Sequence, residues 1–344
     1  MRSNKNTVVI ASAGSRKTTL LVEEALRIRD RRVLITTFTN ENVDQINSFL
    51  VSKNGHVPEN ITVASWYSLL LQDGVRPYQN HITNRDRIES INFDATPPLY
   101  AKKSDIDKYY LTRHNNIYRD RVADFVCQCD QRSGGLVIKR LEKIYGSIFL
   151  DEVQDLAGYD LEILEKLLCS SISIFAVGDP RQATFSTNNA SKNKKFKRRH
   201  ILDWIREKEK SGLIVVTEHT DCYRCNQLIC DFADALFPQL PRTNSKNATV
   251  TEHDGIFRIK QDEVLAYLDK HKPTVLRHNK GTDTMSLRAL NIGLTKGRTY
   301  DRVLIFPTAP MKAYLKTKDL SKAGDLAKLY VAVTRAKYSV AFVV

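Results

Sequence analysis

The sequence has no long hydrophobic run and few cysteines. No stretch of about 18 apolar residues occurs, the length that a membrane-spanning helix requires. The six cysteines are too few and too unevenly spaced for a disulfide framework in a chain of 344 residues, so we expect reduced thiols. The first residues also lack the apolar core of a secretory signal. We therefore expect a soluble, cytoplasmic protein without a membrane partner.

Acidic residues are scarce relative to basic ones. The chain carries 53 Lys and Arg residues against 39 Asp and Glu, a formal net charge of +14. Because Lys and Arg neutralise phosphates, this excess favours a nucleic acid as partner, although a similar excess also serves solubility alone. Hydrophobic residues make up 42% of the chain, which is enough for buried cores in about two domains.

Short apolar runs alternate with helical patterns from residue 7 onward, which predicts parallel strands joined by crossover helices. In the first part of the chain we expect strands at 7–11, 32–38, 61–65, 147–151 and 173–177, and helices at 18–29, from a cap at Asn40, at 67–71 and at 159–169. A polar stretch at about 73–142 interrupts the alternation of strands and helices and predicts an insertion. A second series follows, so the sequence predicts one lobe over 1–212 and another over 213–344.

The first predicted strand leads directly into the segment Ala11–Thr19, which reads ASAGSRKTT. A strand, a loop of small residues, Lys-Thr and a helix are typical of a phosphate-binding loop, although a strand-to-helix turn without a ligand is the alternative. In such a loop Lys17 contacts the β- and γ-phosphates and the Thr18 hydroxyl binds Mg²⁺. The usual pattern has glycine where this chain has Ala11 and Arg16. We therefore expect Arg16 either to strain the loop or to point outward.

The predicted strand at 147–151 ends in two acids, Asp151 and Glu152, followed by Gln154 and Asp155. In phosphate-loop enzymes such a strand end places an aspartate on Mg²⁺ and a glutamate where it orients and deprotonates the attacking water. An acidic helix cap after a core strand is the simpler interpretation. The Lys-Thr loop upstream favours the catalytic one.

Further segments follow in an ordered series. They are TFTN at 37–40, SWYS at 65–68, DEVQD at 151–155, GDPRQ at 178–182, YR at 223–224, KG at 296–297 and LYVAVTRAK at 329–337. In this set and order the chain resembles the UvrD/Rep/PcrA-like superfamily 1 DNA helicases. The resemblance implies an α/β fold of two RecA-like P-loop NTPase lobes with parallel sheets, an ATP cleft between the lobes and reduced accessory subdomains.

The resemblance also implies specific roles. ATP with Mg²⁺ would be bound by Ala13, Gly14, Ser15, Arg16, Lys17, Thr18, Thr19 and Tyr223, with Thr18 and Asp151 on the metal. Catalysis would fall to Glu152, Gln182, Arg224 and Arg335. Single-stranded DNA would contact Phe38, Thr39, Asn40, Ser65, Trp66, Tyr67 and Phe185, although burial in the core is the common fate of any one of these aromatic rings.

The chain departs from the family at several positions. Phe185 and the three residues after it replace a Trp-Arg pair, while Gly293 and Thr299 stand where a His and a Glu are expected. The expected activity is 3′→5′ movement along single-stranded DNA, with ATP hydrolysis coupled to lobe closure. A nucleotide-gated regulatory subunit of a nuclease or defence complex, as in antiviral systems such as Gabija, is the alternative. RNA remains open as the bound strand.

Three cysteines, Cys222, Cys225 and Cys230, lie close together in the sequence. Four ligands at regular spacing are missing, so we favour buried thiols over a zinc or iron–sulfur site.

Overall fold

The computed structural model describes residues 6–344, which form two compact units. The first unit contains the chain up to Val9, Lys17–Pro180 and Phe185–Thr217. The second contains Glu218–Val344 and two short segments from earlier in the chain, Ile10–Arg16 and Arg181–Thr184. Both short segments belong to predicted nucleotide-binding motifs. The units are therefore not contiguous stretches of sequence, unlike the lobes over 1–212 and 213–344 that the two series of strands and helices predict.

A six-stranded sheet has the order β3-β2-β6-β7-β1-β8. Its strands are β1 Thr7–Ala11, β2 Val33–Thr37, β3 Ile61–Ser65, β6 Ser147–Leu150, β7 Ser173–Gly178 and β8 Val215–His219. β2 pairs in parallel with β3 and β6, and β6 pairs in parallel with β7. The predicted alternation of parallel strands and helices is confirmed here. β2 and β6 are buried along their whole length, as strands covered on both faces usually are, whereas the edge strand β8 is largely exposed.

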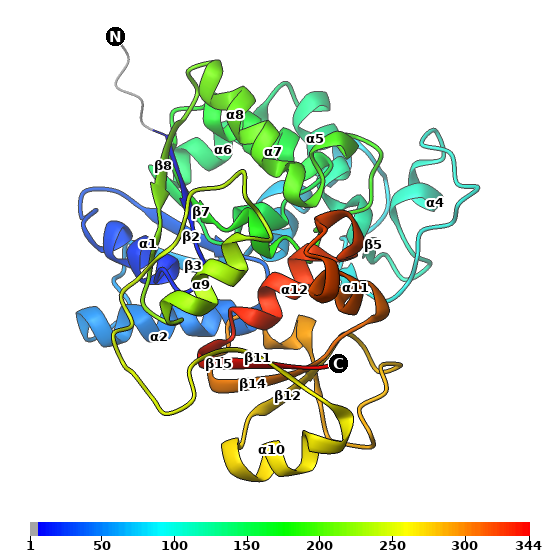
Figure 1. Cartoon of the computed structure of the whole chain (residues 1–344). Coiled ribbons are helices and arrows are strands. Elements are labelled where there is room, and N and C mark those ends of the chain that lie inside the picture. Colours follow the sequence, from blue (N-terminus) through cyan, green and yellow to red (C-terminus); the bar gives the residue numbers. More distant parts are fainter. Residues whose placement is uncertain (1–5) are drawn as a thin grey trace. The chain divides into compact units, whose positions relative to one another are not determined.

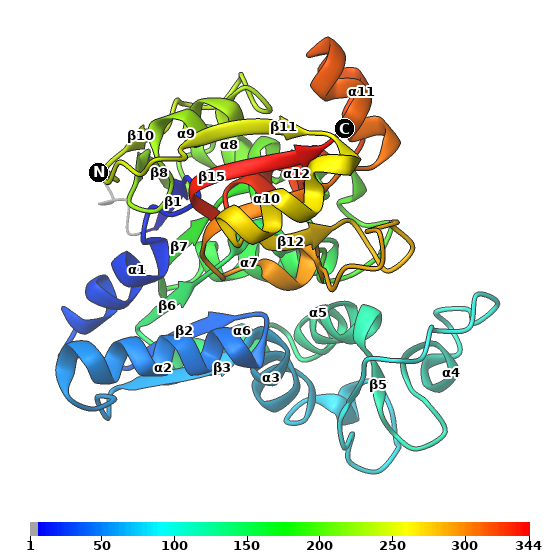
Figure 2. The ribbon, with the colours of Figure 1, turned by 60° about the horizontal axis from the view of Figure 1, so that its bottom comes forward.

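The helices of the first unit are α1 Lys17–Leu26, α2 Asn40–Asn54, α3 Trp66–Leu69, α4 Ile106–Tyr110, α5 Val122–Arg132, α6 Leu136–Ile144, α7 Tyr159–Cys169 and α8 Ile201–Lys210. Buried residues of α1 and α2, among them Leu21 and Ile46, pack with strand residues such as Ile35 and Phe149 in one core cluster. Figure 2 shows α2 lying along β2 and β3. This packing holds the carboxyl ends of the strands in place.

The cap of α2 differs from the predicted one by a residue. Thr39, not Asn40, precedes the helix in extended backbone, and its hydroxyl accepts a hydrogen bond of 3.2 Å from the Asn42 amide. A side-chain oxygen at the cap satisfies an amide that has no partner within the helix. Asn40 is the first helical residue, so the expectation that it caps α2 is wrong.

The predicted insertion at 73–142 is largely structured. It begins in a π-helical turn, Leu70–Val75, and contains a two-stranded parallel sheet of β4 Ile91–Asn92 and β5 Ile117–Tyr118. Its last helices, α5 and α6, belong to the body of the first unit, because α5 packs against α7 and buries eight of its eleven residues. Figure 1 shows α4 and β5 in cyan, apart from the strands of the large sheet. The projecting part of the insertion is therefore shorter than the sequence suggests.

The second unit has a five-stranded parallel sheet in the order β11-β15-β14-β12-β13. Its strands are β11 Gly255–Ile259, β12 Thr274–Arg277, β13 Leu290–Asn291, β14 Tyr300–Phe306 and β15 Ala336–Val343, and a separate parallel pair joins β9 Asp221–Cys222 to β10 Asn244–Ser245. The helices are α9 Gln227–Asp234, α10 Val264–His271, α11 Ala309–Thr317 and α12 Leu326–Val333. Val264 and Tyr267 of α10 share a core cluster with β12, β14 and β15, and Figure 1 shows α10 beside β12.

Candidate functional site

Two side chains at the start of α1 contact the acidic end of β6. Thr18 Oγ1 donates a hydrogen bond of 2.9 Å to Asp151 Oδ2, across 133 positions of sequence. Lys17 Nζ lies 3.2 Å from Glu152 Oε1 in an ion pair whose side chains are only 15% and 10% exposed. All four residues belong to the first unit. The structure thus brings together two pairs of predicted site residues from two separate motifs.

The backbone after β6 turns sharply at Glu152. This residue has a φ of 59°, in the left-handed region that residues with a Cβ rarely adopt. Asp151 Oδ1 accepts a hydrogen bond of 2.9 Å from the Glu152 amide, and Gln154 Nε2 donates to Glu152 Oε2. The turn therefore fixes both carboxylates just past the carboxyl end of a buried strand, where open parallel sheets place their ligands.

Burial shapes the electrostatics of this strand end. Burial, and then the negative charge of Glu152, raise the pKa of Asp151 to about 6, while Lys17 and the Thr18 hydroxyl act in the opposite direction. Because both dominant effects disfavour the ionised carboxylate, the site favours a positive charge close to Asp151.

A close contact joins the acidic turn to the end of β7. Gln154 Oε1 accepts a hydrogen bond of 3.0 Å from the Asp179 amide. A Cβ at Gly178 would collide with the same oxygen, so only glycine fits beside Gln154. The GDPRQ and DEVQD segments are therefore held together by Gln154, a residue to which the resemblance gives no role.

The phosphate-loop segment Ile10–Arg16 makes its contacts within the second unit. The Gly14 carbonyl accepts a hydrogen bond of 2.9 Å from the Tyr223 amide, and the Ala13 amide donates one of 3.2 Å to Tyr330 Oη. Gly14 has a φ of 75°, and a Cβ there would come within 2.7 Å of Arg224 Cβ. Glycine is thus required at this position both for its backbone conformation and for the close approach of Arg224.

Arg16 shows both of the features that the sequence offered as alternatives. Its φ of 62° lies in the left-handed region where the family pattern has glycine, and its side chain is exposed. The guanidinium carbon lies 4.1 Å from the centroid of the Tyr223 ring, within cation–π distance. The side chain therefore turns away from the loop interior and covers a face of a residue predicted to contact nucleotide.

Arg335 is buried in the second unit and contacts Gln182. Its Nη2 donates a hydrogen bond of 3.2 Å to Gln182 Oε1, and its Nε donates one of 3.1 Å to the Val331 carbonyl. Arg224 Nη1 donates one of 3.0 Å to the Thr334 carbonyl. Three of the four predicted catalytic residues, Gln182, Arg224 and Arg335, therefore converge on the start of β15.

Each unit contributes residues that suit part of a nucleotide: the loop segment of the second unit suits an anion, and the first unit suits a phosphate with a divalent cation. Ser15 Oγ is buried without a hydrogen-bond partner among the described residues, which leaves a donor inside the loop for an anion. Thr18 and Asp151 offer the oxygen ligands that Mg²⁺ prefers, and Lys17 offers a cation to a phosphate. Thr19, the third residue of α1, is half-buried.

The predicted strand-contacting aromatic residues differ in exposure. Trp66 is fully buried, and its Nε1 donates a hydrogen bond of 2.7 Å to Asp160 Oδ1. Tyr67 and Phe38 are 7% and 8% exposed, whereas Phe185 is 43% exposed. As the structure stands, of these four rings only Phe185 presents a large surface to a base.

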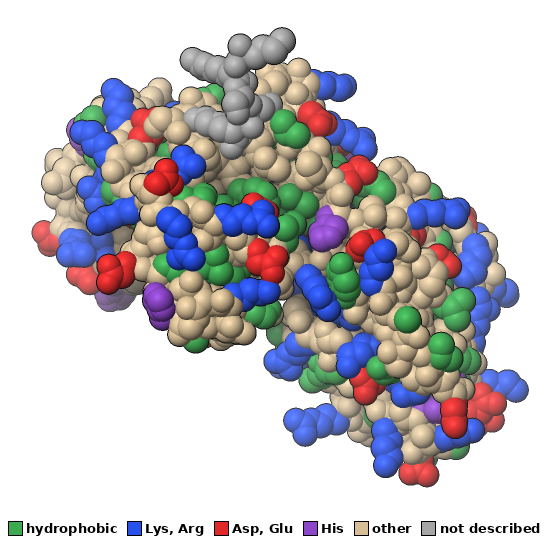
Figure 3. Space-filling model, turned by 90° about the vertical axis from the view of Figure 1, so that its left-hand side faces the viewer, with side chains coloured by type: hydrophobic (Ala, Val, Ile, Leu, Met, Phe, Trp, Pro, Cys, Tyr) green, Lys and Arg blue, Asp and Glu red, His purple; other side chains and the backbone are tan. Residues whose placement is uncertain are grey.

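The polar members of the predicted strand-contacting set lie at helix starts. Ser65 Oγ accepts a hydrogen bond of 3.1 Å from the Ser68 amide at α3, and Thr39 caps α2. Thr39 and Asn40 are exposed. Figure 3 shows Lys and Arg side chains spread over one face with acidic ones between them, so charge alone does not mark a path for a strand on that face.

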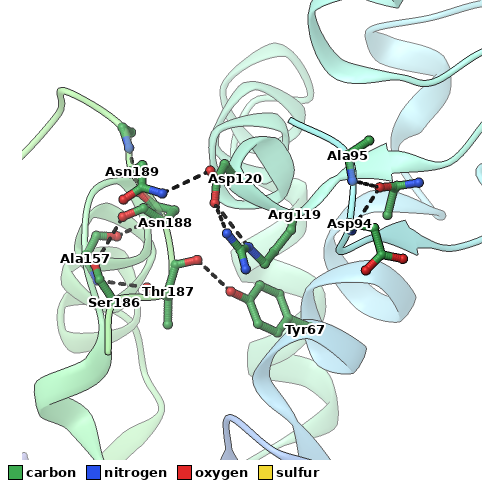
Figure 4. Close-up of polar contacts among 12 residues, drawn as sticks. Tyr67, Asp94, Ala95, Arg119, Asp120, Ala157, Ser186, Thr187, Asn188 and Asn189 are labelled. Carbon is green, nitrogen blue, oxygen red and sulfur yellow. Dashed lines mark hydrogen bonds and ion pairs between the residues drawn. The ribbon is translucent and has the colours of Figure 1, made fainter. Parts of the chain in front are cut away.

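Sequence reasoning missed a buried polar network around Asp160. Besides Trp66, its carboxylate accepts hydrogen bonds from Thr187 Oγ1 at 2.5 Å and from Asn188 Nδ2 at 2.8 Å. The Thr187 carbonyl accepts one of 2.6 Å from Tyr67 Oη (Figure 4). The available signal was the run of three polar residues after Phe185, in the segment where the family has Trp-Arg. Two of them, Thr187 and Asn188, anchor the loop after GDPRQ to α3 and α7.

All six cysteines are free, and Cys222, Cys225 and Cys230 are buried. Among residues 6–344, no group of three or more His, Cys, Asp or Glu side chains is arranged to hold a metal ion. Over the same residues, none of the helices has the length and apolarity needed to cross a bilayer.

Solved structures with a similar fold include arterivirus helicases. The crystal structure of Arterivirus nonstructural protein 10 (helicase) matches with a TM-score of 0.52 and 16% identity, over 98% of this chain and 59% of that one. The same protein in complex with DNA matches with a TM-score of 0.53 and 16% identity, over 98% and 60%. The chain thus spans about 60% of the length of these neighbours, and at this identity the likeness concerns the fold.

Two family models match most of the chain between them. One, described as an AAA domain, matches residues 1–188, and the other, described as the viral superfamily 1 RNA helicase core domain, matches residues 111–344. No curated protein matches the sequence. The α/β fold with parallel sheets that the sequence predicts is confirmed by the sheets and by these matches. The chain belongs to the family of superfamily 1 helicase cores.

Proposed function

We propose that the chain is an ATP-dependent helicase or translocase that acts on single-stranded DNA and couples hydrolysis to closure of its lobes. The observation that carries the proposal is the contact of Thr18 with Asp151 and of Lys17 with Glu152. These contacts join the two motifs that a nucleoside triphosphatase requires, in a chain of a helicase family.

The loop and the first turn of α1 would hold the phosphates. The buried Ser15 hydroxyl and the N-terminus of α1 suit an anion, and the Lys17 ammonium would exchange Glu152 for the β- and γ-phosphates. When Mg²⁺ is bound, it supplies charge neutralisation on these phosphates, with Thr18 and Asp151 as the protein ligands. Glu152, released from Lys17, would orient the attacking water and accept its proton.

Charge that develops on the transferred phosphoryl group needs cations. Arg224 and Arg335 are the candidates, because both guanidinium groups donate hydrogen bonds to Thr334 and therefore lie close together. Arg335 also contacts Gln182. Arginines in this role are worth on the order of 10³ to 10⁵ in rate. Gln182 would report the state of the nucleotide to Arg335 through their shared hydrogen bond.

By analogy with the UvrD/Rep/PcrA-like helicases, we propose that the chain moves along the strand in the 3′→5′ direction. We also propose that it acts in the cytoplasm. Phe185, Thr39 and Asn40 are the exposed residues available for strand contacts, with Phe38, Ser65, Trp66 and Tyr67 supporting them from within the fold. Streptavidin-displacement assays with the label at either end of an oligonucleotide measure direction. Movement towards the 5′ end supports the UvrD-like mechanism, and movement only towards the 3′ end contradicts it.

ATP hydrolysis with and without oligo(dT) tests the activity itself. We expect many-fold stimulation by the oligonucleotide, and we expect Lys17→Ala to abolish turnover because it removes the phosphate-binding cation. Lys53→Ala is the matched control, since Lys53 pairs with Glu23 on the exposed side of α1 and α2. A Lys17→Ala protein with normal turnover would refute the assignment of the nucleotide site.

A regulatory role is the second candidate function. Arg16 in place of glycine and Phe185 in place of tryptophan motivate a nucleotide-gated subunit that binds DNA for a nuclease or another defence protein with little unwinding. A low hydrolysis rate that oligo(dT) does not change would favour this role over the motor.

RNA is the alternative strand, because the matching family is described as an RNA helicase core whereas one structural neighbour was solved with DNA. Competition between DNA and RNA oligonucleotides of the same sequence decides between them, since the 2′-hydroxyl is the local difference.

A further inference from the structure

An exposed phenylalanine, Phe93, stands at the end of β4 in the insertion. Its side chain is 53% exposed, more than Phe185 at 43%. Asn92 Oδ1 accepts hydrogen bonds of 3.2 Å from the Asp94 amide and 2.7 Å from the Ala95 amide, which hold the turn around Phe93. A ring exposed on a fixed turn has the planar surface and the rigid support that stacking on a base requires.

Phe93 is braced by a buried ring. Tyr67 lies edge-to-face with Phe93, with ring centroids 5.3 Å apart and an interplanar angle of 89°. Tyr67 is in turn fixed by its hydrogen bond to the Thr187 carbonyl, which Figure 4 shows. The edge-to-face geometry leaves ring surface of Phe93 uncovered, consistent with its exposure. Phe93 is therefore an exposed ring that packs, through Tyr67, on α3 and on the loop after GDPRQ.

Arg119 occupies the equivalent place on the neighbouring strand. β4 and β5 pair in parallel with Asn92 opposite Tyr118, so the residues that follow, Phe93 and Arg119, leave the same edge of the small sheet. Arg119 pairs with Asp120 at 3.1 Å, and Asp120 Oδ2 accepts a hydrogen bond of 3.3 Å from Asn189 (Figure 4). The guanidinium group of Arg119 thus lies at the same edge of the small sheet as Phe93, and its ion pair with Asp120 holds it in position.

A basic segment continues from this place. Lys197 Nζ donates a hydrogen bond of 2.7 Å to Asn189 Oδ1, and exposed Lys and Arg side chains surround it in the sequence at Lys194, Lys195, Arg198 and Arg199. These cations, together with Arg119, suit the phosphates of a nucleic acid. Asp94 and Asp120 lie close by and reduce the local positive charge.

We propose that Phe93 is a base-stacking platform for a single-stranded nucleic acid, with Arg119 and Lys197 contacting the backbone of the same strand. The inference rests on the proposed function and adds a binding residue outside the motifs. Trp66, predicted to contact the strand, is buried, so an exposed ring beside it would take over its stacking role, and Thr187 in the loop after GDPRQ holds Tyr67 behind Phe93.

The introduced indole of Phe93→Trp provides a direct test. Both native tryptophans, Trp66 and Trp204, are buried at 0% and 2% exposure, so a tryptophan at position 93 would be the exposed fluorophore. We expect oligo(dT) of about 20 nucleotides, longer than a typical site for one fold, to quench its fluorescence on stacking. An unchanged emission at saturating oligonucleotide would overturn the platform.

Affinity provides the second test. Stacking is worth about 1–3 kcal/mol per base, so Phe93→Ala should weaken oligo(dT) binding roughly 5- to 150-fold in fluorescence anisotropy. Because stacking is not ionic, this factor should be similar at low and high salt, whereas the loss in Arg119→Ala and Lys197→Ala should shrink as salt rises.

Tyr100→Ala is the matched control, since Tyr100 is another exposed ring of the insertion, 77% exposed. Phe93→Leu keeps an apolar side chain without a planar face and should bind as weakly as Phe93→Ala. Equal affinity of Phe93→Ala and wild type, or an equal loss in Tyr100→Ala, would refute the proposed role of Phe93. Failure of the wild type to bind any oligonucleotide would instead refute the proposed function itself.

Discussion

Two buried aspartates of the first unit, Asp151 and Asp160, look alike by burial and differ in their partners. Burial raises the pKa of each carboxyl group to about 6. Asp160 is surrounded by neutral donors from Trp66, Thr187 and Asn188. Asp151 has a hydroxyl on one oxygen and an ion pair, Lys17 with Glu152, beside it.

The difference in partners distinguishes a structural carboxyl group, Asp160, from one proposed to take part in chemistry, Asp151. Neutral donors from three segments hold Asp160 in a single arrangement, so its carboxylate acts as a structural junction. In the proposed nucleotide site, a cation and phosphate oxygens would replace the present partners of Asp151, namely Thr18 and the ion pair of Lys17 with Glu152. A shifted pKa thus identifies a buried carboxyl group, while the partners indicate whether the group is available for a reaction.

The largest expected effect sharpens the chemical side of this comparison. Glu152→Gln keeps the size and a hydrogen-bonding side chain but removes the proton acceptor, so kcat for ATP should fall on the order of 10²- to 10⁴-fold. Nucleotide binding should change little, because in the proposed site Lys17, and not Glu152, contacts the phosphates. Steady-state hydrolysis and equilibrium nucleotide binding measure the two quantities, and a normal kcat would contradict the assignment of Glu152.

The next effect concerns the structural side. Asp160→Ala leaves the Trp66 indole N–H without its acceptor and removes a contact from Thr187 and Asn188, so we expect a loss of about 3 kcal/mol in unfolding free energy. Urea unfolding followed by tryptophan fluorescence measures it, with Asp44→Ala on the exposed side of α2 as control. A loss no larger than that of the control would show that the Asp160 network contributes nothing to stability.

The smallest effect is a dependence on pH. A carboxyl group with a higher pKa in the folded chain binds more protons when folded, so its contribution to stability is present below about pH 4 and is lost as pH rises through about 6. Asp160→Asn cannot titrate. The difference in unfolding free energy between Asp160→Asn and wild type should therefore shift by about 2 kcal/mol in favour of the variant between pH 4 and 7.

Asp151→Asn should show a shift of the same sign in apo protein, since the pKa of Asp151 is raised in the same direction. Saturating Mg²⁺ and nucleotide should reduce the shift for Asp151 and leave that for Asp160 unchanged. Identical responses of the two variants to nucleotide would break the distinction between the two carboxylates.

Sequence alone predicted the parts of the fold that depend on local pattern. The apolar strands, the start of α1 at the Lys-Thr pair and the acidic end of β6 follow from short segments with a strong physical reason. Motif chemistry assigned Lys17, Thr18, Asp151 and Glu152 to one nucleotide site, and the structure places them together, although the direct pairs of Lys17 with Glu152 and of Thr18 with Asp151 were not predicted.

The sequence pattern did not predict the contacts between segments that are far apart in the chain. Nothing in the pattern around Trp66 shows that Asp160 accepts its N–H, or that the Thr187 carbonyl holds Tyr67. Burial of an aromatic residue depends on what packs over it, so Trp66 and Phe93 could not be ranked for exposure before the fold was known. The cap at Thr39 was missed because two adjacent residues both suit the role.

The backbone of Arg16 has a consequence for how phosphate loops are recognised. The loop requires a positive φ at this position, and Arg16 adopts a φ of 62°. Its side chain packs on the ring of Tyr223. Glycine is therefore the easiest residue there without being obligatory. A sequence pattern that requires glycine at this position would therefore overlook chains in which a larger residue adopts the same backbone conformation.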